Sequence, residues 1–441
     1  MTRIPFCPCE YSFEYSKKTS LWRVLPFAAL LSGATAITAQ AAPVTAKSAD
    51  KFVDSMGIAT HYQNTDGLYA NFDANIKGRL QELGVRYVRT DTATSASNRA
   101  TLIARARSLG QAGIKSYLIV ESRKSNGVYN TDTHTPQEVV QMLKDIGPQF
   151  CVVEGPNEPE HSNDAWRFFY NGYEWPNLQG IRDFTRDVYN AVKSDPATAS
   201  VPVLPASMLS NGAQIGDLST HLDFGNLHTY PTGEPPVGLF FGDNLNNARQ
   251  ISGSKPMVCT ETGYTTAQNP NGTGFKGVPD DVQAKYLARV YFGFWNRGLT
   301  RTFVYQLLNP TTGSPTDIQA HYGIIRGDGV PKPAFNTIKN ITSILKEATF
   351  NSSTQSWNAP SFSPGNLDYS LVGDTTNIET TLLQKSNGKF YLALWQNAES
   401  YAIWRDEYNM DCASGNCGFD SYRVNVPTRR LGIVINGSRV T

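Results

Sequence analysis

Two glutamates, each placed at the end of a short apolar run, are the residues best suited to do chemistry. Glu158 lies in the hexapeptide Glu-Gly-Pro-Asn-Glu-Pro, which follows the apolar residues 150–153. Glu261 closes the run Pro-Met-Val-Cys-Thr-Glu at residues 256–261. Carboxyl groups work in pairs when one must give a proton and the other must attack or accept one. The two positions therefore suggest paired-carboxylate chemistry.

The elements that must position this pair alternate between short β-like runs and longer amphipathic ones. Eight runs are typical of buried strands: 56–60, 85–90, 115–120, 150–154, 201–206, 224–228, 257–260 and 302–307. Helices are predicted between them, at 76–83, 100–112, 136–146, 178–193 and 280–296. This order predicts an α/β fold, a (β/α)8 TIM barrel. An open doubly wound sheet is disfavoured, because no glycine-rich phosphate loop follows the first strand.

In such a barrel the carboxyl ends of all strands meet on one face, so residues far apart in the sequence can meet there. Glu158 follows predicted strand four and Glu261 ends predicted strand seven. Cleavage of a glycosidic bond needs one carboxylic acid to protonate the leaving oxygen and one carboxylate to attack or to activate water. The placement of the two glutamates suits that reaction.

With these motifs in this order, the chain resembles clan A glycoside hydrolases. These are retaining (β/α)8 enzymes with Asn-Glu after strand four and Glu after strand seven. The resemblance implies that Glu158 is the general acid and base and that Glu261 is the nucleophile. It also implies that Asn157 binds the sugar 2-hydroxyl.

Two further matches support the resemblance. His228-Thr229-Tyr230 follows predicted strand six and matches the clan's His-x-Tyr, whose Tyr hydrogen-bonds the nucleophile. Arg89, at the end of predicted strand two, matches the Arg that keeps the nucleophile ionised. The resemblance therefore implies that His228, Tyr230 and Arg89 belong to the same site.

Within the clan, the chain is most similar to glycoside hydrolase family 39 and to family 5-like members. This similarity rests on the Asp-Gly-x-Pro-Lys-Pro-Ala motif at residues 328–334 and on a β region after the barrel. The resemblance covers about residues 52–346. One position departs from the pattern: many clan members carry Trp after strand eight as a sugar platform, and this chain has Tyr305.

Structural roles are the alternative for several of these residues. Glu158 would then cap a helix, Glu261 would be a salt-bridged acid at the edge of the core, and His228 a satisfied core histidine. Glu154 competes with Glu158 for the acid role, but inside a strand it is expected to be buried or paired.

The ends of the first strands leave similar alternatives. Arg89 could simply neutralise Asp91 or Glu121. His61, beside Tyr62 at the end of predicted strand one, is a candidate for substrate contact, with packing as the alternative.

The loop after predicted strand four is rich in aromatic residues, with polar residues between them. Sugar rings have CH-rich faces that pack on aromatic rings, although the same aromatics could pack the loop onto the barrel. The loop at residues 231–242 is a candidate for the opposite wall. The predicted substrate-binding residues are Asn157, Arg89, His228, Tyr230, His61, Tyr305, Trp166 and Trp175.

Composition limits the partners. The 39 Lys+Arg nearly balance the 38 Asp+Glu, and no basic run is interleaved with aromatics, so nucleic acid is not an expected partner. The six histidines are scattered, and we predict neither a metal nor a cofactor. Cys412 and Cys417 flank a short turn and are candidates for a disulfide, whereas Cys151 and Cys259 are expected to pack as apolar residues.

Residues 1–41 have the features of an export signal. Basic residues precede the apolar stretch 24–37, and Ala39-Gln40-Ala41 has the small-x-small pattern of a cleavage site. The stretch is too short to span a membrane permanently. We therefore expect a secreted or periplasmic protein with no membrane contact after cleavage. A start codon further downstream is possible, because the region before the apolar stretch is long.

The mature chain is predicted to have two domains, a barrel at residues 42–346 and a C-terminal antiparallel β domain at residues 347–441. A helix is expected from Pro333 to about residue 346. The predicted strands of the β domain are 380–384, 389–395, 424–426 and 431–435, and Ser386-Asn387-Gly388 is a predicted hairpin turn.

These features predict an exported retaining glycoside hydrolase that acts on an oligo- or polysaccharide through two glutamates. The alternatives are a non-catalytic carbohydrate-binding protein on a degenerate barrel, and a lyase or transglycosylase on the same fold. The identity of the sugar, endo or exo action and the oligomeric state are left open at this stage.

Overall fold

The computed structural model describes residues 43–92, 96–125, 128–129, 134–162, 167–238, 240–268, 275–401, 423–424 and 426–435. These residues belong to one compact unit, Pro43–Thr441. The predicted signal segment, Trp166, Cys412 and Cys417 lie outside the described residues. No helix within the described ranges is long and apolar enough to cross a membrane.

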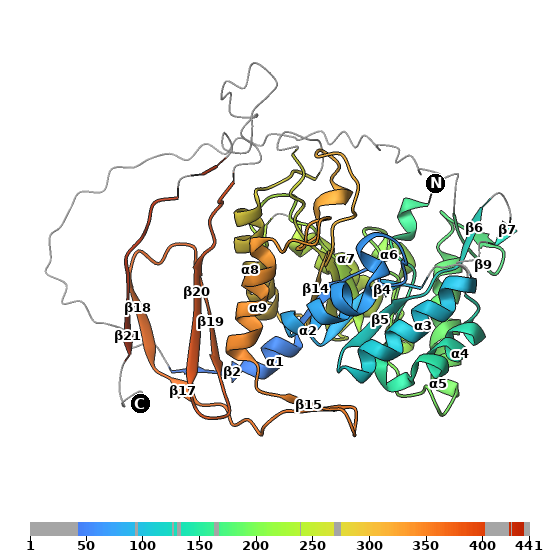
Figure 1. The fold of residues 1–441 in the computed structure, drawn as a ribbon, viewed down its shortest axis with the longest axis horizontal. Coiled ribbons are helices and arrows are strands. Elements are labelled where there is room, and N and C mark those ends of the chain that lie inside the picture. Colours follow the sequence, from blue (N-terminus) through green and yellow to red (C-terminus); the bar gives the residue numbers. More distant parts are fainter. Residues whose placement is uncertain are drawn as a thin grey trace, which may run out of the picture. The chain divides into compact units, whose positions relative to one another are not determined.

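Eight parallel strands form a nearly closed barrel, which confirms the predicted fold (Figure 1). In chain order they are β3 (Met56–Ala59), β4 (Tyr87–Asp91), β5 (Lys115–Ile119), β8 (Cys151–Glu154), β11 (Val203–Leu204), β12 (Gly225–His228), β13 (Met257–Thr262) and β14 (Arg301–Val304). The last strand, β14, pairs with the first, β3. The ladder is open between β11 and β12, where the backbone N–H of Asp223 donates to the Val203 carbonyl at 2.9 Å.

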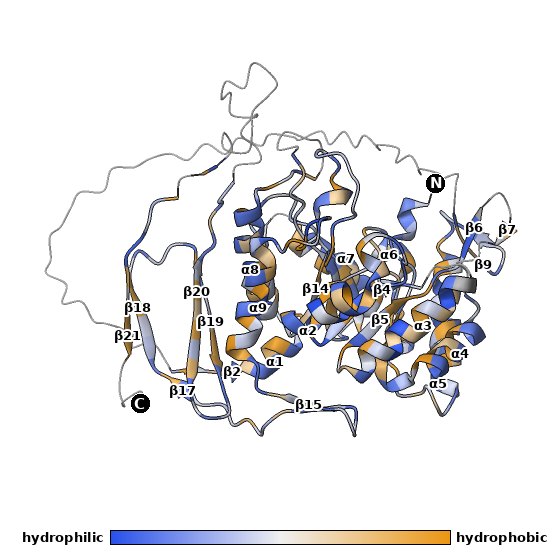
Figure 2. Ribbon diagram, in the orientation of Figure 1, coloured by the Kyte–Doolittle hydropathy of each residue, from blue (hydrophilic) through white to orange (hydrophobic). Residues whose placement is uncertain are grey.

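Helices follow the strands, as the alternating pattern predicts. They are α1 (Ala49–Asp54), α2 (Arg79–Leu83), α3 (Ala96–Gln111), α4 (Pro136–Ile146), α5 (Gln179–Ser194), α6 (Gly212–Ile215), α7 (Phe241–Ser252), α8 (Asp280–Asn296) and α9 (Pro333–Leu345). A π-helical turn, Asp73–Gly78, precedes α2. The start of α4 is set by a reciprocal capping box between Thr135 and Glu138. Figure 2 shows apolar and polar faces on the same helices, as expected when one face covers the sheet.

A layer of large side chains fills the barrel interior. Its buried members are Tyr117, Val152, Leu204, Val258 and Phe303. Side chains alternate along a strand, so residues two positions beyond this layer also face the interior. Glu154 lies two residues beyond Val152, at the carboxyl end of β8. This register points its carboxyl group into the barrel interior.

Further antiparallel strands are added on the loops and at the chain ends. A four-stranded sheet of β6 (Arg123–Ser125), β7 (Val128–Tyr129), β9 (Arg167–Tyr170) and β10 (Tyr173–Glu174) is built from the segments after β5 and β8. The C-terminal region contributes β15 (Thr349–Asn351), β16 (Ser356–Asn358), β17 (Asn366–Leu367), β18 (Tyr369–Gly373), β19 (Ile378–Gln384), β20 (Phe390–Gln396) and β21 (Leu431–Ile435). Strands β19 and β20 pair antiparallel across the predicted turn, which confirms that hairpin.

The amino-terminal residues join the C-terminal strands. Strand β1 (Val44–Thr45) pairs with β17, and β2 (Lys47–Ser48) pairs with β19. The side chain of Asn296, at the end of α8, also bonds Thr380 and Thr381 on β19, at 3.0 and 2.9 Å. The division at residues 346 and 347 stays a prediction. The strand predicted at 424–426 is not formed at Val424 or Val426.

Candidate active site

Arg89 and Glu154 form a buried ion pair in the barrel interior. Arg89 donates from Nε and Nη2 to the two oxygens of Glu154, both at 2.8 Å. Burial opposes ionisation of Glu154, but the adjacent Arg89 and the nearby His228, whose Nε2 lies 3.9 Å from Oε1, outweigh it, and the pKa falls to about 2. Glu154 is therefore a buried anion that holds the guanidinium, as predicted from its place inside a strand.

Glu261 reaches the same guanidinium through an irregularity in β13. Thr260 faces the interior and donates to Glu154 at 2.9 Å, so regular alternation would turn Glu261 the other way. The pairing of β13 shifts on both sides near these residues, and such shifts re-aim side chains. As a result, one oxygen of Glu261 accepts from Arg89 Nη1 and the other accepts from the Tyr230 hydroxyl at 2.6 Å.

Glu158 stands on a tight turn after β8. Its backbone has φ of 40°, in the left-handed region, and its N–H donates to Ser207 Oγ at 3.1 Å. Oε1 lies 2.7 Å from His228 Nδ1, and Oε2 lies 3.0 Å from His161 Nδ1. Burial raises the pKa of Glu158, but the bonds with His161 and His228 outweigh it and hold that pKa below its usual range.

The two glutamates lie close together. A carboxylate oxygen of Glu158 and one of Glu261 lie within 4.8 Å of each other. Retaining glycosidases hold their two carboxyl groups about 5–5.5 Å apart, whereas inverting enzymes leave about 6.5–9.5 Å for a water molecule. Both carboxyl groups therefore lie within reach of a single bond of a bound substrate.

His228 lies between the acidic groups and is buried. Its Nδ1 faces Glu158, and its Nε2 lies 2.9 Å from Thr260 Oγ1. Burial lowers the pKa of His228, but Glu261, Glu154 and Glu158 together raise it to about 9. His228 is thus a buried histidine, and it also contacts the proposed acid directly.

The same three side chains could in principle hold a cation. Glu158, His228 and Glu261 offer three ligand atoms within 4.8 Å of one another. A histidine binds a metal as the neutral imidazole, whereas the raised pKa of His228 favours the imidazolium. The oxygens of Glu261 already accept from Arg89 and Tyr230, so the cluster fits acid–base chemistry better than metal binding.

Asn157 is oriented by its neighbours. Its Oδ1 accepts from Arg89 Nη2 at 2.6 Å, and its backbone N–H donates to Glu121 Oε1 at 3.1 Å. Because the guanidinium occupies Oδ1, the amide NH2 is the end of Asn157 left to contact a substrate.

Arg89 does not pair with the acids that the sequence suggested as alternatives. Asp91 pairs instead with His61, 2.8 Å from its Nδ1, and Glu121 pairs with Arg123 at 2.6 Å. Arg89 thus joins Glu154, Asn157 and Glu261, and the suggestion that it simply neutralises Asp91 or Glu121 is wrong.

An aromatic group adjoins the glutamates. His61 Nε2 lies 3.2 Å from the Tyr305 hydroxyl, and Tyr305 meets the ring of Tyr322 edge-on at 5.5 Å. Tyr322 also meets the ring of Tyr230 at 5.7 Å. Tyr62 is instead fully buried and bonds Ser116, so it packs rather than binds.

Trp175 is not brought to this group. It is half-buried against the hydrophobic core, and its backbone N–H donates to the Phe168 carbonyl at 2.9 Å. In the predicted wall at 231–242, Phe241 is buried against Phe294, and Phe240 is exposed. Cys151 and Cys259 are free and buried, as expected.

Three contributors were missed by sequence reasoning. His161 bonds Glu158 and Tyr322 flanks Tyr230 and Tyr305, while Thr260 joins His228 to Glu154. A signal existed for His161, which follows Glu158 by three residues in a Pro-containing turn. Tyr322 arrives from the long segment after β14, and no local pattern places it.

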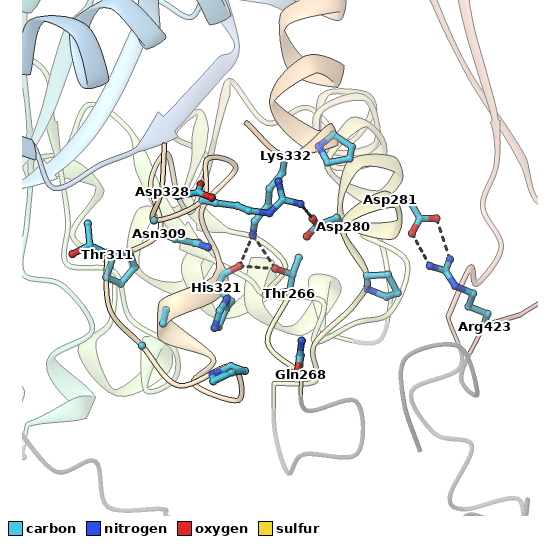
Figure 3. A pocket seen from close by; sticks show the side chains of 18 residues that line it. Thr266, Gln268, Asp280, Asp281, Asn309, Thr311, His321, Asp328, Lys332 and Arg423 are labelled. Atoms are coloured by element: carbon cyan, nitrogen blue, oxygen red, sulfur yellow. Dashed lines mark hydrogen bonds and ion pairs between the residues drawn. The ribbon is translucent and has the colours of Figure 1, made fainter. Parts of the chain in front are cut away.

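A cavity of about 750 Å³ lies apart from the two glutamates, which are not among its lining residues (Figure 3). Lys332 lies in this cavity wall and donates to Thr266 Oγ1 and the His321 carbonyl. Arg326 and Arg423 are paired with Asp280 and Asp281. Each of these arginines thus has its own carboxylate partner.

Comparison with known proteins finds similar solved structures, although no family model and no curated protein matches the chain. A family 39 glycoside hydrolase from the gut symbiont Bacteroides cellulosilyticus WH2 is similar over 79% of this chain and 80% of its own, with 14% identity and a TM-score of 0.48. A family 39 enzyme from Xanthomonas axonopodis pv. citri is similar over 69% of this chain and 69% of its own, with 15% identity and a TM-score of 0.48. An endo-laminarinase from Formosa is similar over 68% of this chain and 90% of its own, with 11% identity and a TM-score of 0.49.

Family 39, which the motifs resemble, is thus among these structural neighbours. At such identities and scores, the function has to be inferred from the side chains of this chain's own site.

Proposed function

We propose that this chain is a retaining glycoside hydrolase that acts on an oligo- or polysaccharide. The observation that carries the proposal is the close approach of the two glutamates, since one oxygen of Glu158 and one of Glu261 lie within 4.8 Å of each other. Their surroundings differ as two roles require. Glu261 is held by a guanidinium and a phenol hydroxyl, and Glu158 lies between two imidazoles.

The reaction divides into two displacements. In the first, Glu261 attacks the anomeric carbon while Glu158 gives a proton to the leaving oxygen, so a glycosyl ester forms and the aglycone departs as an alcohol. In the second, Glu158 takes a proton from water, which attacks the same carbon and releases Glu261. The anomeric configuration is inverted twice and therefore retained.

The surrounding residues serve these steps. Arg89 and Tyr230 each donate to one oxygen of Glu261, which orients the attacking carboxylate. Asn157 presents its amide NH2, and His61 and Tyr305 supply polar atoms at the adjacent strand ends. Together they could fix the sugar hydroxyls around the reacting carbon, a positioning effect that rate enhancement depends on.

Replacing the nucleophile tests this function. We expect Glu261→Gln to lower kcat/KM on a hydrolysed glycoside by about 10⁴-fold or more, because an amide cannot form the glycosyl ester. Glu379→Gln is the matched control and should keep full activity, since Glu379, on β19, pairs with Arg297 at the end of α8. A panel of aryl glycosides and polysaccharides identifies the substrate, and full activity of Glu261→Gln on it would contradict the proposal.

Product analysis separates the alternatives. We expect the product to keep the anomeric configuration of the substrate, and NMR on freshly formed product measures it. An unsaturated sugar would indicate a lyase, longer chains a transglycosylase, and binding without any product a carbohydrate-binding protein.

We further propose that the enzyme is exported, on the basis of the signal-like residues 1–41. The test is fractionation of a producing cell, with amino-terminal sequencing of the exported protein. A mature start near Ala42 is expected, and a cytoplasmic full-length chain would overturn this proposal.

A further inference from the structure

The two oxygens of Glu158 face two histidines in contrasting environments. Oε1 lies 2.7 Å from His228 Nδ1, and Oε2 lies 3.0 Å from His161 Nδ1. The side chain of His228 is 0% exposed, whereas that of His161 is 52% exposed. Only one of the two imidazoles therefore has direct access to solvent protons.

His228 is poorly placed to exchange a proton with water. Its Nε2 bonds Thr260 Oγ1, which in turn bonds Glu154 and Asn226. Both ring nitrogens are thus engaged inside the barrel, among groups that are themselves buried. The raised pKa of His228 agrees with an imidazolium that keeps its protons.

His161 is held beside Glu158 by the local backbone. The two residues bracket a single 3-10 turn, Pro159–His161, and the His161 N–H donates to the Glu158 carbonyl at 2.9 Å. The left-handed backbone of Glu158 directs the chain into this turn. The contact between Nδ1 and Oε2 is therefore part of the same short segment that carries the acid.

Taking Glu158 as the acid and base of the proposed function, we infer that His161 is a positioning residue that stores the catalytic proton and passes it to Oε2 of Glu158. In the empty site the proton sits on His161 Nδ1. When substrate is bound, the Nδ1–H bond breaks and an Oε2–H bond forms, so imidazolium and carboxylate become neutral imidazole and carboxylic acid. That proton then goes to the leaving oxygen.

The second displacement restores the starting state. Water gives a proton to Oε2 of Glu158 as its oxygen attacks the glycosyl ester, and Oε2 returns the proton to His161 Nδ1. No other reactant is needed, because each proton lost by one group is gained by its neighbour.

The charges around His161 support this storage role. The hydrogen bond with Glu158 raises the pKa of His161, burial lowers it, and the nearby Glu160 and Glu261 raise it further. Burial raises the pKa of the neighbouring Glu160 to about 7. His228 faces the opposite oxygen of Glu158 and is the remaining charged group of this cluster.

The test combines two substitutions with two leaving groups. The first variant is His161→Asn, whose amide can still donate a hydrogen bond to Oε2 of Glu158 but cannot carry the catalytic proton. His161→Gln is the second variant, used if His161→Asn folds poorly. On an aryl glycoside with a poor leaving group, we expect kcat/KM to fall about tenfold, because protonation of that group is needed. On a dinitrophenyl glycoside, which departs without protonation, the change should stay within about twofold.

The pH profile gives the second readout. With the poor leaving group, the alkaline limb of kcat/KM should move to lower pH in His161→Asn, because Glu158 alone loses its proton earlier than the pair does. The matched control is His221→Asn, at a partly buried histidine that precedes β12. This change should alter neither the kcat/KM on the two substrates nor the pH profile.

Two results would overturn the role of His161: equal losses on both substrates, or an unchanged alkaline limb. Its failure is distinguishable from failure of the proposed function. If only the role of His161 fails, the unsubstituted enzyme still hydrolyses glycosides and Glu261→Gln does not. If the proposed function fails, Glu261→Gln keeps the activity.

Discussion

Two buried arginines, one before strand β4 and one within it, each hold a carboxylate with two hydrogen bonds. Arg86 precedes the amino end of the strand and bonds Asp50 at 2.6 and 3.0 Å. Arg89 lies towards the carboxyl end and bonds Glu154 twice at 2.8 Å. Both side chains are almost completely buried, so the two pairs have nearly the same local chemistry.

The difference lies in what else each pair contacts. Asp50 also accepts the backbone N–H groups of Glu347 and Ala348, and the Arg86 guanidinium lies 4.5 Å from the ring centre of Trp357. These contacts join the segment before the first barrel strand to the segment after α9. All of these contacts are made within the protein, so the Arg86 pair holds separate parts of the chain together.

Each arginine also reaches a second carboxylate: Arg86 Nη1 lies 3.5 Å from Asp54 before the first barrel strand, whereas Arg89 Nη1 donates to a carboxylate at the carboxyl ends of the strands. That carboxylate is Glu261, whose side chain remains 11% exposed. The comparison teaches that a buried arginine–carboxylate pair does not reveal its role by geometry alone. In a barrel the role depends on the end, because the carboxyl ends carry the site and the amino ends carry stability.

The same substitution at both arginines is the sharpest way to break this comparison. We expect Arg89→Lys to lower kcat/KM by about 10²–10³-fold, because one ammonium cannot replace a fork that bonds Glu154, Asn157 and Glu261 together. Steady-state kinetics on the substrate identified for the unsubstituted enzyme measure the effect. If Arg89→Lys kept full activity, the guanidinium would be no more than a structural cation.

Arg86→Lys should do the opposite. Loss of the two-pronged bond to Asp50 and of the stacking on Trp357 is expected to lower the free energy of unfolding by about 2 kcal/mol. Urea unfolding followed by fluorescence measures it. The kcat at a temperature where the variant is folded should stay within about twofold of the unsubstituted enzyme. A large loss of kcat in the folded variant would mean that the two ends are coupled.

The smallest effect concerns acid stability at the amino end. Burial opposes ionisation of Asp50, but Arg86 and two backbone N–H groups outweigh it and lower its pKa below 3.8. The unfolded chain therefore binds the proton more readily, so this carboxylate stabilises the fold fully above pH 3.8 and loses that contribution as the pH falls further.

Asp50→Asn removes this titration. The difference in unfolding free energy between Asp50→Asn and the unsubstituted protein should be constant above about pH 5 and shrink below about pH 4. Urea unfolding at several pH values measures it. A difference that does not change with pH would show that Asp50 is not held as an anion by Arg86.

Much of the barrel was predictable, because its elements carry strong local signals. The short apolar runs predicted all eight strands, and α4 and α8 match their predicted bounds, 136–146 and 280–296. Buried parallel strands are apolar on both faces, and amphipathic helices between them repeat with a helical period. Less regular segments were harder: the helix predicted at 76–83 begins as a π-helical turn, Asp73–Gly78.

Contacts between distant segments could not be read in the same way. The pairing of β1 and β2 with C-terminal strands joins residues more than three hundred positions apart, and no periodicity encodes it. Trp175 packs partly against the core, and its contact with a sugar stays a prediction, because an aromatic ring in a loop can serve either purpose.

Residue types and spacing were enough to predict the number and order of the barrel strands and to select Glu158 and Glu261 as candidates. Strand ends are local features, and barrel topology then brings those ends together. Only the tertiary structure decided which groups each glutamate meets. The shifted register of β13 turns Glu261 towards Arg89, and the turn after Glu158 places His161 on its second oxygen. Such contacts depend on backbone register and on neighbours that are remote in the chain, which residue types and spacing do not specify.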